Sequence, residues 1–269
     1  MFVYRIIIIL IIIHFVGYRY VYNYFLYSFY HRWLKGKMNM ESISTQDIIP
    51  LDLNCIMGAV EFSLAFLHQV IDETKESIRF QEVAEKRLMD INDFFWNDAF
   101  GLWCDFDLES NSLIPEYYAS VFFIFWLNGF CDVQSFSRNH RQEKAMDKLK
   151  ALGVFDYHGI PTSLINSGQQ WDFPNVWPPL QHTAVKGLMN STNFQHRKLG
   201  ESLAKRFIEN CYVSWKTQGC MFEKYDVTRS GKAGEGGEYE VQEGFGWTNA
   251  VVIDFLHMFG HRWKSPNID

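Results

Sequence analysis

The sequence lacks the short motifs of several common protein classes. Its five cysteines form no CxxC pair, so a cysteine-based zinc site has no support. No phosphate-binding loop, dinucleotide-binding fingerprint or HExxH motif is present. The formal net charge of −6 also argues against a non-specific nucleic-acid binder. We therefore expect no metal, no cofactor and no nucleic-acid partner.

Acidic side chains are absent from the first 40 positions, and the first carboxylate is Glu41. The same segment contains several basic residues, namely Arg5, Arg19, Arg32, Lys35 and Lys37. The rest of the chain is strongly acidic. This break predicts two parts: a basic, apolar and aromatic leader over 1–40, and a main domain over 41–269.

The leader has three possible interpretations, which the sequence leaves open. Residues 6–13 read IIIILIII behind a single arginine, which resembles a signal peptide or signal anchor. The apolar run is short for a membrane span, which needs about 20 residues. Its tyrosines and tryptophan also suit an interfacial anchor, and a segment foreign to the fold is the third interpretation. The first two predict a secreted or membrane-associated protein.

From Glu41 onward the sequence predicts an all-α protein with few and short strands. Apolar spacing, prolines and glycines indicate helices separated by long loops rich in Trp, Asp, Gly and Pro. The expected helices cover 55–79, 81–96, 115–131, 141–153, 178–189, 194–216 and 248–259. This alternation predicts helical hairpins arranged in a ring, with the loops gathered at one mouth.

Two loop segments combine aromatic and polar residues in a way that suits a sugar. The first is QQWDFPNVWPPLQ over 169–181, where Trp171 and Trp177 offer flat faces and Gln170, Asp172 and Asn175 offer hydrogen-bonding groups. The second covers 223–249 and is rich in carboxylates, glycines and aromatics. A proline-rich turn with buried tryptophans and a solvated acidic hairpin are the structural alternatives.

Both segments closely resemble the two C-terminal signatures of the α,α-trehalases. The shared features are QQWDFPNVWPPLQ and EKYD followed by GGEYEVQEGFGWTN, and DIIPLDLN and FFWNDAFGLWCDFD are also similar to that family. The resemblance extends from about Thr45 to the end. It implies an (α/α)6 barrel-like toroid of helical hairpins, incomplete in this chain. It also implies hydrolysis of the 1,1-linked glucose disaccharide trehalose with inversion.

An inverting glycosidase needs a general acid for the leaving oxygen and a general base for the attacking water. The resemblance implies that the base is Glu223 of the EKYD segment. It implies that Glu238 of the GGEY segment contacts the substrate. Trp177, Gln170 and Asp172 are weaker candidates for the sugar-binding wall. The implied partner is trehalose or a similar small saccharide.

The chain departs from the family where the general acid is expected. That residue is an aspartate in an SGWD-type motif shortly before the DIIPLDLN-like segment, and here the region reads YFLYSFYHRWLKGKMNM. Asp172 is a disfavoured substitute. We therefore expect weak or no trehalose hydrolysis by this chain. The alternatives are a non-catalytic trehalase-like sugar-binding or partner protein, or a truncated gene product.

Overall fold

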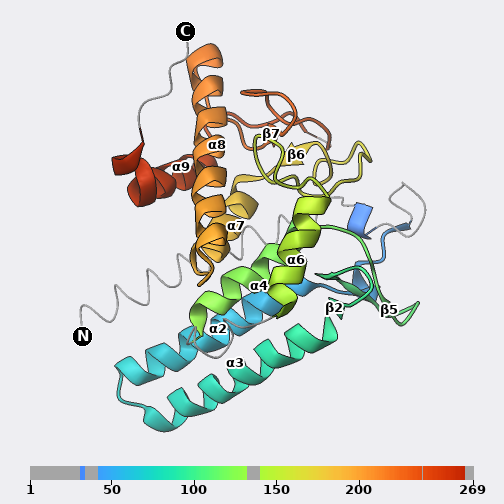
Figure 1. The fold of residues 1–269 in the computed structure, drawn as a ribbon, viewed down its shortest axis with the longest axis vertical. Coiled ribbons are helices and arrows are strands. Elements are labelled where there is room, and N and C mark those ends of the chain that lie inside the picture. The colour runs from blue at the N-terminus through green and yellow to red at the C-terminus, as the bar shows by residue number, and fades with distance from the viewer. Residues whose placement is uncertain (1–30, 34–41, 132–139, 238, 264–269) are drawn as a thin grey trace.

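The computed structural model describes residues 31–33, 42–131, 140–237 and 239–263. The signal, anchor and membrane interpretations of the leader therefore fall almost entirely outside the described residues. The described part is mostly helical, as the sequence predicts (Figure 1). Its main helices are α2 (Leu51–Val70), α3 (Thr74–Phe94), α4 (Phe122–Leu127), α6 (His140–Ala151), α7 (Pro178–Met189), α8 (Phe194–Gln218) and α9 (Gly246–Phe259).

The first hairpin of helices turns earlier than the sequence suggests. α2 ends at Val70 and α3 begins at Thr74, so the helix predicted over 55–79 is wrong in its boundaries. Asp72 adopts φ 61° in the turn, and the Glu73 amide donates to the carbonyl of His68 at 2.9 Å. No glycine or proline marks this turn, which explains why the pattern did not reveal it.

α2 is long and apolar enough to cross a membrane by length and composition alone. It packs against α3 and α4, and Leu51, Cys55, Ala59 and Phe62 on one face are buried. A core helix passes the same test of length and composition. The packing of α2 accounts for its apolar residues on that face without a bilayer.

Residues 115–131 do not form one continuous helix. α4 is flanked by 3₁₀ turns at Ala119–Val121 and Asn128–Phe130, and Tyr118 before them is extended and bridges Ser163. α4 packs against α7 so closely that a Cβ on Gly187 would lie 2.8 Å from the backbone nitrogen of Trp126. The lack of a Cβ at Gly187 therefore permits this close approach of the two helices.

Within the described residues, the strands are two residues long and form three small antiparallel sheets. β1 (Ile48–Ile49), β4 (Phe106–Asp107) and β5 (Ser112–Leu113) form one sheet, and β2 (Trp96–Asn97) pairs with β3 (Leu102–Trp103). β6 (Asn175–Val176) pairs with β7 (Tyr225–Asp226) beside α8 (Figure 1). The main contribution to the core comes from the helices, whose buried apolar residues join into one cluster.

A buried arginine connects the short N-terminal turn His31–Trp33 to the helical domain. Arg32 donates to Asp52 at 2.8 Å and to Asp105 at 2.7 Å. A second hydrogen bond joins the guanidinium to each of these carboxylates. Its guanidinium also lies 4.6 Å from the ring centroid of Trp33. Residues 31–33 lie within the predicted leader, yet they contact α2 and the residue before β4.

Candidate active site

The two sugar-binding segments predicted from the sequence meet at the β6–β7 ladder. Asn175 pairs with Asp226 and Val176 pairs with Tyr225 in antiparallel register. The ladder continues beyond the strands, because the amide of Val227 donates to the carbonyl of Pro174 at 2.9 Å. Residues 169–181 and 223–249 therefore form one structural unit.

Asn175 also holds the glycine-rich loop that follows β7. Its amide nitrogen donates to the carbonyl of Glu235 at 2.8 Å, and its Oδ1 accepts the amide of Glu235 at 3.0 Å. The side chain thus imitates a neighbouring strand. Gly234 lies so close that a Cβ there would meet Asn175 Oδ1 at 2.4 Å. A larger residue at 234 is incompatible with this clamp.

Glu223 lies two residues before the start of β7 and is buried, with 2% of the residue exposed. Its Oε1 accepts the hydroxyl of Tyr239 at 3.0 Å. Its Oε2 is buried and finds no hydrogen-bond partner among the residues that the structure describes. Buried carboxylate oxygens are normally satisfied, so Oε2 is an acceptor suited to a water or hydroxyl group.

The backbone around Glu223 is fixed by the start of α9. The indole of Trp247 donates to the Glu223 carbonyl at 2.8 Å, and the hydroxyl of Thr248 donates to the Phe222 carbonyl at 2.6 Å. Burial raises the pKa of the Glu223 carboxyl, while the Tyr239 hydrogen bond and the nearby Lys224 act in the opposite direction. A carboxyl whose pKa is shifted toward neutrality suits proton transfer.

Three tryptophans of the two segments pack against one another. The rings of Trp171 and Trp177 are parallel, with centroids 3.7 Å apart, and Trp247 meets Trp177 edge-on at 5.5 Å. Trp171 and Trp177 are each 1% exposed, whereas Trp247 is only half-buried. Trp177 therefore packs against Trp247 from the protein interior, and Trp247 and Tyr239 are the more exposed aromatic residues.

Gln170 and Asp172 are both buried, but they bind different partners. Gln170 accepts a hydrogen bond from the ammonium of Lys224 at 2.9 Å, so it is in contact with the residue after Glu223. Asp172 accepts the hydroxyls of Ser163 at 2.8 Å and Ser167 at 2.6 Å. Its carboxylate thus shapes its own loop. Glu238 lies outside the described residues.

Sequence reasoning did not identify Tyr239, Lys224 or Asn175 as residues around Glu223. Lys224 follows Glu223 and Tyr239 follows Glu238 in the sequence. Their position next to the two candidate glutamates was the signal that could have identified them. Asn175 was named only as a hydroxyl-binding group, and its contact with Glu235 depends on the β6–β7 register. That register has no local sequence signature.

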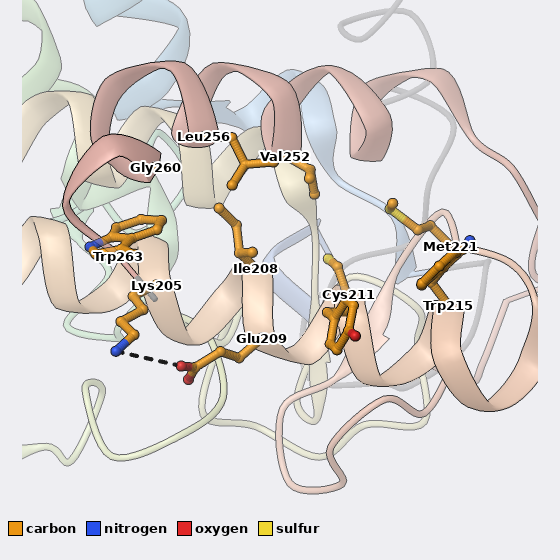
Figure 2. Close-up of a pocket in the computed structure, with 11 residues that line it drawn as sticks. Lys205, Ile208, Glu209, Cys211, Trp215, Met221, Val252, Leu256, Gly260 and Trp263 are labelled. Atoms are coloured by element: carbon orange, nitrogen blue, oxygen red, sulfur yellow. Dashed lines mark ion pairs between the residues drawn. The ribbon is translucent and has the colours of Figure 1, made fainter. Parts of the chain in front are cut away.

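A separate groove of about 430 Å³ lies between α8 and α9 (Figure 2). Trp215, Met221, Leu256 and Trp263 give it a mainly apolar lining, and Lys205 faces Glu209 at 3.8 Å on α8. None of the predicted site residues within the described part of the chain lines it. The groove is therefore distinct from the surroundings of Glu223.

Solved structures of glycoside hydrolases share the fold of the described helices. The chain matches the neutral trehalase Nth1 from Saccharomyces cerevisiae with a TM-score of 0.59 and 21% identity, over 79% of this chain and 38% of that one. It matches a mannosylglycerate hydrolase from Thermus thermophilus in complex with glucose with a TM-score of 0.56, 16% identity and coverages of 78% and 48%. These are (α/α)6 glycoside hydrolase structures, matched over part of their length.

The chain belongs to the trehalase family, because the family profile described as Trehalase matches residues 24–260. It is 37% identical to a probable trehalase from Oryza sativa, over 87% of this chain and 44% of that protein. It is 35% identical to the trehalase of Homo sapiens, over 89% of this chain and 41% of that protein. The chain thus spans about two fifths of the curated relatives it matches. The family match begins before Thr45, where the resemblance was expected to start.

Proposed function

We propose that the site around Glu223 binds trehalose or a closely similar glucoside and that Glu223 is the general base of an inverting hydrolysis. The observation that carries this proposal is the state of the carboxylate. One oxygen is held by Tyr239 and the other is buried without a described partner. A water on Oε2 would be oriented and would lose a proton to a carboxylate whose pKa is raised by burial.

The sugar-binding wall in this proposal comes from both signature segments. Gln170 and Trp177 belong to the first, and Trp177 backs the half-buried Trp247 of the second. We assign Glu238 a contact with sugar hydroxyls on the strength of the family resemblance. Asp172 supports the wall indirectly through the serines that bind it. The described helices form part of an (α/α)6 toroid in this proposal.

Hydrolysis of trehalose itself is expected to be very slow for residues 1–269. Residues 1–40 contain no carboxylate that could protonate the leaving oxygen. Asp172 does not replace it, because both of its oxygens accept serine hydroxyls. General acid catalysis typically contributes about 10²–10⁴-fold. The rate should therefore fall by at least that factor relative to an enzyme with both carboxyl groups.

A substrate that needs no general acid tests the proposed base. Fluoride leaves without protonation, so α-D-glucosyl fluoride should be hydrolysed through Glu223 alone, and NMR should detect β-glucose as the first product. E223Q should lower this rate by about 10²-fold or more. E240Q changes an exposed glutamate of the same loop and is the matched control.

Four results would contradict all or part of the proposal. Equal fluoride hydrolysis by E223Q and the unchanged chain would exclude Glu223 as the base. Absence of both fluoride hydrolysis and trehalose binding by calorimetry would exclude a glucoside site. Trehalose binding without any fluoride hydrolysis would instead support the non-catalytic sugar-binding alternative. Trehalose turnover at an ordinary enzymatic rate would contradict the expected loss of general acid catalysis.

A further inference from the structure

Lys224 is a fully buried cation next to Glu223, with an exposed fraction of 0%. Its ammonium donates to Gln170 Oε1 at 2.9 Å and to the carbonyl of Gly236 at 3.0 Å. These acceptors belong to the two signature segments. One side chain therefore connects the loop before β6 to the glycine-rich loop after β7.

The same ammonium lies against two aromatic rings of the site. It is 5.2 Å from the ring centroid of Trp177 and 5.4 Å from that of Tyr239, within the range of cation–π attraction. The hydroxyl of Tyr239 is the group that donates to Glu223 Oε1. A continuous set of contacts thus leads from Lys224 through Tyr239 to the carboxylate.

We propose that Lys224 is a positioning residue that holds Tyr239 and the glycine-rich loop 234–237 against Glu223. This inference rests on the proposed function of Glu223 as the base. Because Lys224 is buried, it acts through its neighbours and does not touch a bound sugar. An apolar side chain of similar length would fill the space, but it could not donate to Gln170 and Gly236.

The energetics of this lysine fit a functional role. Burial lowers its pKa to about 8, and the attraction of Glu223 opposes that change. A charged ammonium in a low-dielectric interior is costly unless it is paired, so a buried lysine is rarely retained for stability. Here the charge provides directed hydrogen bonds and a positive potential beside Glu223.

The first test is a mutant cycle on α-D-glucosyl fluoride. K224M keeps most of the length of the side chain and removes its charge, and it should lower kcat/KM by about 10-fold or more. Contacting residues in one network are not additive. Since Lys224 acts through Tyr239, K224M combined with Y239F should cost little more than K224M alone. K232M changes an exposed lysine of the same loop and should leave the rate unchanged.

The second test measures the positioning without any turnover. Hydrogen exchange of the loop 234–237 should become at least about 10-fold faster in K224M, while exchange of α2 stays the same. K224R, which keeps a cation, should restore part of the protection. Q170A removes one acceptor while Lys224 remains, and it provides the same measurement if K224M does not fold.

The outcomes separate this inference from the function on which it rests. If E223Q leaves fluoride hydrolysis unchanged, Glu223 is not the base, whatever K224M does to the loop. If Glu223 is required but K224M is folded, retains its rate within about 2-fold and leaves exchange of 234–237 unchanged, the positioning role is wrong. Strict additivity of K224M and Y239F would likewise overturn the proposed route through Tyr239.

Discussion

The hydroxyl of Tyr239 donates a hydrogen bond to Glu223 Oε1 over 3.0 Å, and the two residues lie on either side of β7 and the glycine-rich loop in the sequence. The bond favours the ionised form of the carboxylate and lowers its pKa, against the opposite effect of burial. Tyr239 therefore orients the proposed base and favours its ionised form.

Removing this hydroxyl should change the pH dependence of fluoride hydrolysis. In Y239F the pKa of Glu223 should rise further, because a group that stabilises the carboxylate is lost. A base must be deprotonated, so the acidic limb of the pH–rate profile should move to higher pH. Y212F, which changes a tyrosine of the α8–α9 groove, is the control and should leave the limb in place. A Y239F limb at the original pH would contradict the assignment.

Two glycines of the second segment should respond differently to the same substitution. G234A places a Cβ against Asn175 Oδ1 and should lower the free energy of unfolding by about 1–3 kcal/mol. G246A meets no atom within 4 Å at the start of α9 and should be neutral or slightly stabilising. Urea unfolding compares the two variants, and equal effects would show that the Asn175 clamp does not constrain the loop.

The charge of the buried Arg32 should contribute strongly to the free energy of unfolding. R32M leaves Asp52 and Asp105 buried without their cation, and it should lower the free energy of unfolding by about 3–5 kcal/mol. K86M breaks an exposed ion pair with Asp90 and should change stability by less than about 0.5 kcal/mol. Urea unfolding near neutral pH measures both. A small effect of R32M would show that residues 31–33 are not part of the stable core.

Lys224 should give the protein a stability that rises with pH on the alkaline side. Its pKa is about 8 in the folded chain and about 10.4 in an unfolded one, so the unfolded state binds more protons between these values. The free energy of unfolding should therefore increase from pH 8 to 10 relative to K224M. K232M removes an exposed lysine, so its free energy of unfolding should change with pH in the same way as that of the unsubstituted protein. A constant difference between the chain and K224M would contradict the lowered pKa.

Helix ends marked by proline or glycine could be predicted closely from the sequence. α7 begins at Pro178 and ends at Met189 as expected, and Gly153 adopts φ 71° just beyond α6. These residues carry their backbone preference with them in any context. The turn at 71–73 has no such residue, because it forms where packing of α2 against α3 requires it.

The candidate site could be predicted in outline, since Glu223, Gln170 and Trp177 come from two recognisable segments. Their arrangement could not, because it depends on the pairing of Val176 with Tyr225 across the fold. Two-residue strands have no detectable periodicity. The same pairing determines that Trp177 is buried and that the ammonium of Lys224 reaches Gln170.

The β6–β7 ladder also has a consequence for the order in which the protein folds. Its partners are roughly 50 residues apart, and closing so long a loop costs entropy that two short strands recover poorly alone. The intervening helices α7 and α8 pack against each other and are neighbours in sequence, so we expect them to associate before the strands pair. Glu223 and the proposed sugar-binding wall should thus assemble late in folding. Ligand binding should therefore be detected only after the helices have packed.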